Sequence, residues 1–406
     1  MKVMLIIMDG MGDRPSDALG GHTPLEAANT HNMDVFASIG VNGIMDPISP
    51  GIRAGSDTAH LSLLGYNPYE VYTGRGPFEA AGEGLELRPG DVAFRCNFST
   101  FEDGKITDRR AGRIKEGTKE LAAVLNGMEI EGVKVIFKES VEHRAVLVLR
   151  GEGLSAKISD ADPHELGPIH EVKPMDDSHE AERTANIVNR FVSESLNRLK
   201  EHPVNLKRME KGLPPANIVL PRGAGMVPHI PSFTERYGIK AGAISGVPIV
   251  KGVCRLAGLD ILDVKGAKGT AESDFHAKVL AGLEYLSEGG DFVLINMKAP
   301  DLFGHDSDPE GKKNILEKID SALEPLNEAT ESTIFAITAD HSTPCEVADH
   351  SGDPVPVLIA GKGVRTDDVE AFGERRAAKG GLCRIRGNDL LNILFQLAGI
   401  SEKFGA

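Results

Sequence analysis

Two short apolar segments in the last third of the chain each lead into residues that bind metal ions, and this feature constrains the fold most. Residues 292–297 and 334–338 are apolar and largely β-branched, which is the pattern of buried parallel strands. The residues that follow are carboxylates and imidazoles: Asp301 and His305 after the first segment, and Asp340, His341 and His350 after the second. Such residues also cap helices and turns. Because ligands collect where parallel strands end, however, we expect these five to converge on one site.

The N-terminus repeats this pattern. Residues 3–8 form an apolar run that ends in Asp9, and Gly10 and Gly12 then allow a tight turn. Further on, Ser56 follows a segment rich in proline and glycine and opens a helix-compatible run. A lone serine in this position is usually a helix cap. Its alternative role is a nucleophile, because unpaired amides and the helix dipole favour negative charge there.

The chain of 406 residues is long enough for two domains. Residues 74–90 are rich in glycine and charge, and residues 211–221 form a proline-rich link. Between them the chain changes to strand-like segments with a few helical stretches. We therefore predict an α/β fold: a doubly wound, mostly parallel sheet formed by residues 1–90 and 215–406, with a smaller α/β domain inserted at 91–214.

The predicted insert is unusually basic near its strand ends. Its candidate anion-binding residues are Arg95, Arg109, Arg110, Arg113, His143 and Arg144, followed by Asp160 and His164. Single arginines are most often solvated surface residues. The net charge of -15, however, means that an anionic substrate must be captured by local positive charge, so we interpret the group as an anion-binding face.

Composition excludes several other classes of protein. The negative net charge argues against a nucleic-acid partner, which requires a basic face. No apolar run approaches the length of a membrane span, and the N-terminal run resembles a buried strand more than a signal peptide. The four cysteines lie far apart and form neither a zinc motif nor a disulfide framework, so we expect a cytoplasmic protein.

The candidate metal ligands are Asp9, Ser56, Asp301, His305, Asp340, His341 and His350. The adjacent residues Asp340 and His341 point apart in an extended or turn conformation, so they would serve two neighbouring ions more easily than one. Paired ions in enzymes lie about 3.5–4 Å apart. A set of oxygen and nitrogen ligands without thiolate suits Mn²⁺ or Zn²⁺, with Mg²⁺ at an oxygen-rich position.

Taken together, the motifs resemble the alkaline phosphatase superfamily. These are MDG around Asp9, GSDTAHLSLLGY around Ser56, APDLFGHD around Asp301 and ADHSTP around Asp340. FRCNF, DRRAGR, EHRAVLVLRG and PRGAG extend the resemblance to the archaeal type of 2,3-bisphosphoglycerate-independent phosphoglycerate mutases, over essentially the whole chain.

This resemblance implies an enzyme of glycolysis and gluconeogenesis that interconverts 3-phosphoglycerate and 2-phosphoglycerate through a phosphoserine, without 2,3-bisphosphoglycerate. Ser56 matches the nucleophile. Asp9, Ser56, Asp340 and His341 match one metal site, and Asp301, His305 and His350 match the other. Two divalent ions are implied, with Mn²⁺ preferred and Zn²⁺, Co²⁺ or Mg²⁺ as alternatives; a homo-oligomer is left open.

Substrate binding is expected from the insert residues named above, together with Arg222, and less strongly from Lys251 and Lys298. Either Asp160 or His164 is a candidate for moving a proton between the glycerate hydroxyl groups. The insert is shorter than in the bacterial and plant enzymes that share this chemistry, so these residues cannot be matched to theirs one by one.

Two alternatives remain at this point. A phosphatase, phosphonate hydrolase or phosphopentomutase with two metals would share the same metal residues, and only the insert argues for phosphoglycerate. An acidic regulatory protein that binds metal or nucleotide without catalysis is the second alternative, and the intact serine and ligand set argue against it.

Overall fold

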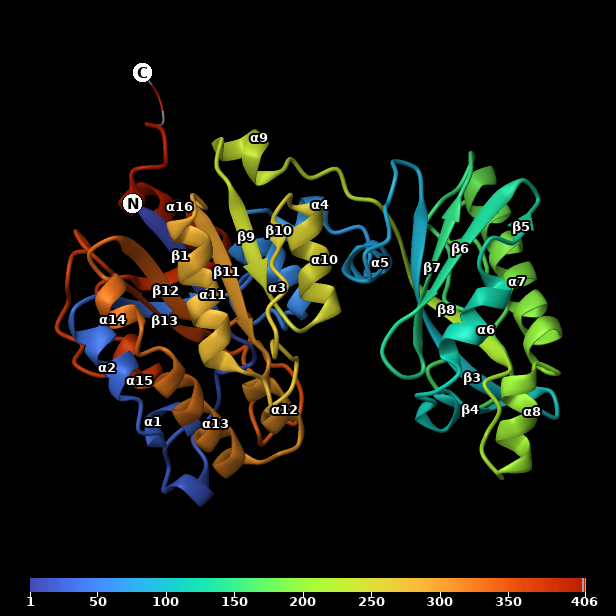
Figure 1. Cartoon of the computed structure of the whole chain (residues 1–406), viewed down its shortest axis with the longest axis horizontal. Helices are drawn as coiled ribbons and strands as arrows, with labels where there is room; N and C mark the ends of the chain where they lie inside the picture. Colours follow the sequence, from blue (N-terminus) through green and yellow to red (C-terminus); the bar gives the residue numbers. More distant parts are fainter. Residues whose placement is uncertain (404, 406) are drawn as a thin grey trace. The chain divides into compact units, whose positions relative to one another are not determined.

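The computed structural model describes residues 1–403 and 405, which fold into two compact units (Figure 1). The first unit comprises Met1–Val71 and the chain from Ile230 onward, and the second unit is Tyr72–His229. Among the described residues, no helix combines the length and the apolar character needed to cross a bilayer.

The first unit is built on a mostly parallel sheet. In order across the sheet, its strands are β10 (Asp260–Ile261), β9 (Ala241–Ile244), β11 (Phe292–Met297), β1 (Lys2–Met8), β12 (Thr333–Thr338), β13 (Val355–Ala360), β2 (Val41–Asp46) and β14 (Cys383–Arg386). The strands from β10 to β12 are parallel, whereas β13 runs antiparallel to both of its neighbours. The central strands β1, β11 and β12 are almost wholly buried, which explains their continuous apolar sequences.

Helices cover both faces of this sheet. On one face lie α2 (His31–Ser38), α11 (Phe275–Ser287) and α13 (Pro309–Ala322), and on the other lie α16 (Gly387–Ala398) and α3 (Ser56–Leu63), with α10 (Pro248–Leu256) packed against α3. Phe36 of α2 packs edge-on against Phe335 at 4.8 Å, and Phe395 of α16 packs against Phe292 from the opposite face at 5.8 Å. The predicted doubly wound α/β class is confirmed.

Shorter helices complete the first unit. These are η1 (Asp17–Leu19), α1 (Pro24–Ala27), α4 (Pro68–Val71), α9 (Phe233–Tyr237), α12 (Ala299–His305), α14 (Leu326–Ala329) and α15 (Glu374–Ala377). Between β1 and β2 the chain forms two separate helices, since α1 ends at Ala27 and α2 begins only at His31. A capping box between Thr23 and Glu26 begins α1, whose C-cap residue Ala28 is extended.

The second unit is an antiparallel sheet covered on both faces. Its strands are β3 (Val92–Glu102), β4 (Lys105–Asp108), β5 (Glu129–Ile130), β6 (Val133–Glu139), β7 (Arg144–Arg150) and β8 (Ile218–Met226). They follow the order β4-β3-β7-β6-β5, with β8 paired to the other side of β3. Its helices are α5 (Gly76–Gly82), η2 (Ala111–Arg113), α6 (Thr118–Leu125), α7 (His179–Leu199) and α8 (Pro203–Glu210).

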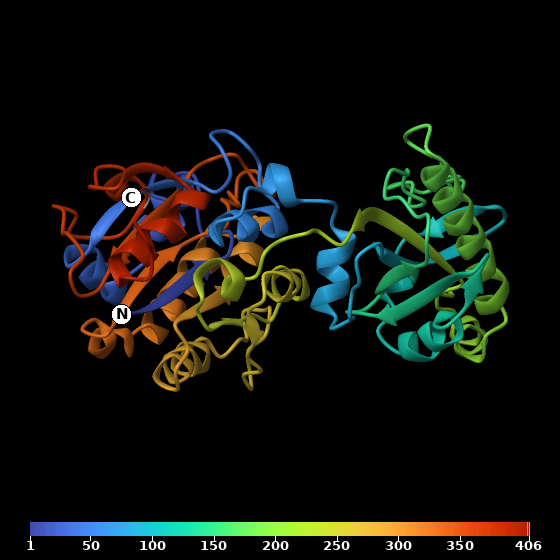
Figure 2. The ribbon, with the colours of Figure 1, turned by 90° about the horizontal axis from the view of Figure 1, so that it is seen from above.

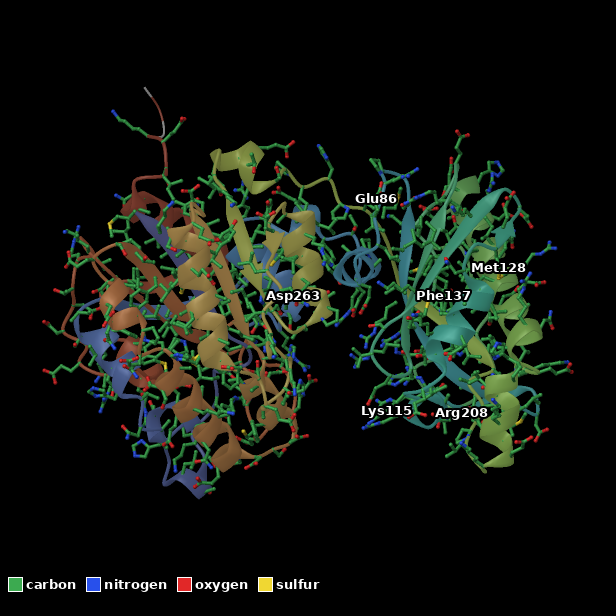
Figure 3. The ribbon with its side chains drawn as sticks, viewed as in Figure 1. Glu86, Lys115, Met128, Phe137, Arg208 and Asp263 are labelled. Carbon is green, nitrogen blue, oxygen red and sulfur yellow. The ribbon has the colours of Figure 1, made fainter. Side chains whose placement is uncertain are left out.

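The two faces of this second sheet have different cores. Figure 2 shows α5 and α7 on opposite sides of the sheet. A large core joins the sheet to α6 and α7 and includes Phe137 and Met128, which are labelled in Figure 3; Phe137 also packs against Phe191 of α7. A much smaller core on the α5 side joins Ala80 to apolar residues of β3 and β7.

The second unit extends beyond the predicted insert, 91–214, on both sides. On the C-terminal side, β8 pairs with β3 and therefore belongs to the insert's sheet. On the N-terminal side, α5 packs on β3 so closely that a Cβ on Gly76 would lie 1.9 Å from the carbonyl oxygen of Ala93. Glycine and proline mark turns locally, but they do not show that α5 and β8 pack against β3.

Candidate active site

Three neighbouring parallel strands of the first unit deliver carboxylates to one edge of the sheet. Asp9 follows β1 directly, Asp340 lies two residues beyond β12, and Asp301 lies in α12, which follows β11. Because β1 pairs in register with both β11 and β12, the segments that follow the three strands leave the sheet side by side. Gly10 has a φ of +65° and a Cβ there would lie 2.7 Å from Cβ of Asp301, so only glycine permits this approach.

Within the described residues, the ligand atoms form two overlapping groups. Asp9, Asp340 and His341 form one, and Asp301, His341 and His350 form the other, with all atoms of a group within 4.8 Å of one another. His341 belongs to both: its Nε2 lies 3.4 Å from Oδ2 of Asp340 and 3.6 Å from Oδ1 of Asp9. His305 joins the second group at its margin, with Nε2 3.5 Å from Oδ1 of Asp301.

A test of whether these residues suit a cation is provided by Asp340. This residue is completely buried, and no described residue donates a hydrogen bond to its Oδ2. A buried carboxylate oxygen without a partner is strongly unfavourable. Oxygen and imidazole donors arranged around it fit a divalent ion.

The imidazoles are held so that Nε2 remains available. Each uses Nδ1 for a contact with a protein oxygen: His305 with Ala348 O at 3.0 Å, His350 with Ala54 O at 2.8 Å, and His341 with Thr343 Oγ1 at 3.0 Å. Such contacts set the tautomer and ring orientation of metal-binding histidines. The backbone carbonyl contacts fix Nδ1 as a donor in His305 and His350, which leaves the Nε2 lone pair free.

Ser56 is the first residue of α3, after the N-cap Gly55. Its Oγ lies 3.4 Å from Nε2 of His341, and the residue is 9% exposed. The hydroxyl therefore faces the ligand groups from the start of a helix, where negative charge is favoured.

Lys298 lies among the carboxylates. Its Nζ lies 2.8 Å from Oδ1 of Asp9 and 2.5 Å from Oδ2 of Asp301. Burial on its own would lower the pKa of Lys298, but the neighbouring carboxylates raise it above its usual value. Lys298 is thus a fixed cation at this site.

Sequence reasoning missed further residues of the site. Asn296 donates from Nδ2 to Oδ2 of Asp9 at 3.0 Å, and Thr343 donates from Oγ1 to Oδ1 of Asp301 at 2.7 Å. His60, one helical turn after Ser56, is also completely buried, with Nδ1 2.7 Å from the carbonyl oxygen of Ser56. Asn296 could have been noticed, because it is a polar residue within a fully buried apolar strand.

The electrostatics of the cluster also indicate a need for positive charge. Burial and the charge of Asp340 raise the pKa of Asp9 to about 8. Burial lowers the pKa of His341 to about 4, despite the opposing effect of Asp340. Burial would raise the pKa of Asp340, but the nearby histidines and Lys298 lower it. Carboxylates at such short range ionise together only with compensating cations.

In the second unit, arginines gather around β3. Arg95 of β3 pairs directly with Arg222 of β8, and Asn97 pairs with Arg144 of β7. Like charges opposite each other across strands are destabilising. In the part of the chain that is described, no hydrogen-bond partner reaches the buried Nε atoms of Arg95 and Arg222, or Nδ1 of His143.

The charges of this cluster act on one another. Burial lowers the pKa of Arg95 to about 9; Glu79 opposes this shift, whereas Arg75, Arg144 and Arg222 act in the same direction as burial. Burial and the neighbouring Arg144 and Arg110 lower the pKa of His143 to about 4, so this imidazole is neutral near pH 7. The cluster therefore suits an anion.

Other predicted substrate residues differ in their surroundings. Asp162 binds Arg109 through two hydrogen bonds of 2.8 Å and holds Nε of Arg222 at 3.6 Å. His164 and Asp160 approach each other at 3.3 Å between Nε2 and Oδ2. Arg110 and Arg113 are exposed, and Lys251 lies in α10 of the first unit.

Comparison with known proteins points in one direction. Residues 37–205 match the family model described as 2,3-bisphosphoglycerate-independent phosphoglycerate mutase. A protein named 2,3-bisphosphoglycerate-independent phosphoglycerate mutase 1 from Methanothermobacter thermautotrophicus is 55% identical over 411 residues, covering 100% of both chains. Its namesake from Methanocaldococcus jannaschii is 52% identical over 412 residues, covering 100% of this chain and 99% of the other.

Two solved structures are also similar. PH0037 protein from Pyrococcus horikoshii has a TM-score of 0.88 and 42% identity, and the match covers 100% of this chain and 99% of that one. The cofactor-independent phosphoglycerate mutase from Thermoplasma acidophilum has a TM-score of 0.77 and 41% identity, covering 98% and 100% respectively.

Proposed function

Since the chain belongs to the family of 2,3-bisphosphoglycerate-independent phosphoglycerate mutases, we propose that it interconverts 3-phosphoglycerate and 2-phosphoglycerate through a phosphoserine at Ser56. The observation that carries this proposal is the position of the Ser56 hydroxyl. It opens α3 and lies 3.4 Å from the histidine that both ligand groups share. A nucleophile placed there can take the phosphoryl group directly.

We also propose that the ligand groups hold two divalent ions. Asp9, Ser56, Asp340 and His341 would bind one, and Asp301, His305 and His350 would bind the other, with His341 close to both. When bound, the ions supply positive charge that favours the ionised serine and offsets the charge of the phosphoryl oxygens. Mn²⁺ fits this mixed oxygen and nitrogen set best, and Zn²⁺, Co²⁺ and Mg²⁺ are alternatives.

The reaction then consists of two transfers at phosphorus. In the first, Ser56 Oγ bonds to phosphorus while the bond from phosphorus to the glycerate oxygen breaks, and that oxygen gains a proton. In the second, the other glycerate hydroxyl loses a proton and attacks the phosphoserine, which frees Ser56. Lys298 offers a fixed positive charge to the anionic phosphoryl group during transfer. Asp160 and His164 are our candidates for the proton transfer.

A mutase differs from a phosphatase in retaining glycerate between the two transfers. We assign retention to the cations of the second unit, led by Arg95, Arg144 and Arg222. The unpaired Nε atoms of Arg95 and Arg222 support this role, because a carboxylate or phosphate would satisfy them. Arg109, Arg110, Arg113 and His143 complete the proposed face.

The cellular setting is part of the same proposal. The reaction would serve glycolysis and gluconeogenesis in the cytoplasm, with a small-molecule substrate. All four cysteines are free and three are buried, as is common in reducing compartments.

The decisive experiment uses the purified chain loaded with Mn²⁺ and an assay coupled to enolase. Conversion of 3-phosphoglycerate with little release of inorganic phosphate is expected. Phosphate release without formation of 2-phosphoglycerate would instead identify a two-metal phosphatase. Absence of both reactions, in protein shown to contain metal, would contradict the proposed activity.

A further inference from the structure

Asn97 carries a buried amide oxygen that accepts no hydrogen bond from any described residue. The residue lies within β3 and is only 5% exposed. Buried amide oxygens are almost always paired, because leaving one unpaired is unfavourable. An unpaired oxygen here calls for a donor that the chain itself does not supply.

Other asparagines of the second unit behave differently. Each accepts a backbone N–H through Oδ1: Asn126 from Phe137, Asn189 from Val172, Asn205 from Ala216 and Asn217 from Phe101. Those amides hold loops and strands together. Asn205 and Asn217 are buried, as Asn97 is, and Asn97 differs from both because its Oδ1 accepts no hydrogen bond from a described residue.

The surroundings of Asn97 are cationic. It lies two residues after Arg95 on β3, so the two side chains point to the same face of the sheet. Arg144 lies directly opposite Asn97, and Arg222 lies opposite Arg95. Asn97 thus lies next to Arg95, Arg144 and Arg222 in the sheet, the arginines that we assign to the substrate.

The chemistry of the ligand follows from these neighbours. Ionised carboxylates and phosphates only accept hydrogen bonds, so they can satisfy arginines but not the oxygen of Asn97. A hydroxyl group can donate to it. A ligand that carries both an anionic group and a free hydroxyl would therefore satisfy the whole cluster.

We propose that Oδ1 of Asn97 accepts a hydrogen bond from a hydroxyl group of the glycerate moiety, which makes Asn97 a specificity-determining residue. This inference rests on the proposed function, which supplies the substrate class. A site built to bond a hydroxyl rejects analogues that lack it, because its own polar group is then left unpaired. Asn97 would thus separate phosphoglycerate from anions of similar charge without a hydroxyl.

The test compares two ligands in the metal-loaded chain carrying Ser56→Ala, so that no turnover disturbs equilibrium. 3-Phosphoglycerate has the hydroxyl, whereas phosphoglycolate has the phosphate and carboxylate without it. By calorimetric titration, we expect 3-phosphoglycerate to bind about tenfold more tightly or better, as for one buried hydrogen bond. Equal affinity of this chain for the two ligands would overturn the proposal without any change at Asn97.

Adding Asn97→Leu should bring the affinity ratio close to one, by weakening 3-phosphoglycerate and leaving phosphoglycolate nearly unchanged. Asn97→Ser, which keeps a smaller acceptor, should give an intermediate ratio. The matched control is Asn189→Leu, whose amide is paired within the unit, and it should keep the original ratio. Circular dichroism would establish that each variant is folded.

Two outcomes with folded Asn97 variants would overturn the inference. One is an unchanged ratio, and the other is equal weakening of both ligands, which would mean that Asn97 only supports the arginines. Failure of the proposed function is distinguished by the enolase-coupled assay on the unaltered chain. That assay depends on turnover and not on the ratio of the two affinities.

Discussion

The two ligand clusters of this chain are opposite in charge, but in both of them buried polar atoms have no hydrogen-bond partner among the described residues. In the first unit, carboxylates and imidazoles surround the buried, unpaired Oδ2 of Asp340. In the second unit, arginines leave the buried Nε atoms of Arg95 and Arg222 unpaired. Folding alone does not favour such atoms. The comparison indicates that each cluster is organised for a ligand of the opposite charge, a cation in one unit and an anion in the other.

The clusters are built by different means. Backbone carbonyl contacts orient His305 and His350, and adjoining strand ends position the carboxylates. In the second unit, cross-strand pairing places Arg95 and Arg222 opposite each other. The first cluster thus depends on where strands end, and the second depends on which strands pair.

Removal of metal should have the largest effect and should act on the first cluster alone. Prolonged incubation with a chelator is expected to lower turnover by several orders of magnitude, because charge stabilisation at phosphorus is lost. Added Mn²⁺ should restore it. Elemental analysis would be run alongside the coupled assay, and full activity in chain shown to be free of metal would refute the two-ion assignment.

Ser56→Ala should be nearly as severe, with a loss of roughly a thousandfold or more as for a removed nucleophile. Unlike chelation, it should leave most of the metal content in place. Phosphoglycerate with a labelled phosphoryl group should label the unaltered chain on the peptide that contains Ser56, and the variant should carry no label. Ser62→Ala changes another buried serine of α3 and serves as the control, which should still be labelled.

Arg95→Ala and Arg222→Ala should disrupt the second cluster and cause a smaller loss of mutase activity than Ser56→Ala. Each removes a charged hydrogen-bond donor, for which about 1–3 kcal/mol, or roughly a ten- to hundredfold weakening of glycerate retention, is typical. Mutase turnover should fall while phosphate release per turnover rises, as measured by enolase coupling and a phosphate assay. Arg190→Ala removes an exposed arginine of α7 and should change neither quantity. Unchanged ratios in both cluster variants would remove the second unit from the retention step.

The residues of the first cluster could be grouped from the sequence because their signals are local. Asp9, Asp301 and Asp340 each follow a short apolar run, and a run of that kind reveals both the strand and its end. Asn296 and Thr343 were missed, since a polar residue next to a ligand has no distinctive spacing. The burial of His60 depends on the packing of α3 against other helices.

The second cluster was harder to predict because it depends on distant pairings. Sequence reasoning grouped the arginines by type and could not separate Arg95, with its unpaired nitrogen, from Arg109, which is bound to Asp162. Residues 215–229 were assigned to the first domain, since nothing local reveals that β8 pairs with β3. Long-range strand pairing therefore determines both the extent of the second unit and its charge arrangement.

The smallest predicted effect concerns Asp162, which holds Arg109 and lies close to Arg222. Its side chain is fully buried, so Asp162→Asn should lower the free energy of unfolding of the second unit by about 1–3 kcal/mol. Denaturant titration followed by circular dichroism would measure this. Loss of the carboxylate should also free both guanidinium groups, and so raise the KM for 3-phosphoglycerate severalfold.

Asp91→Asn sharpens the comparison, because Asp91 forms an equivalent buried pair with Arg150 in the same unit but lies apart from the arginine cluster. It should lower stability in a similar way and leave the KM unchanged.

A pH series adds a second check on Asp162. Burial alone would raise the pKa of Asp162, but hydrogen bonds from Arg109 and the His164 amide lower it below its usual value. The stabilisation is therefore complete above the pKa of an unfolded aspartate, about 3.9, and is lost as the pH falls through the lower value in the folded state. The stability difference between unaltered chain and Asp162→Asn should shrink over that acidic range; a difference that persists there would show that the charge of Asp162 does not hold the arginines.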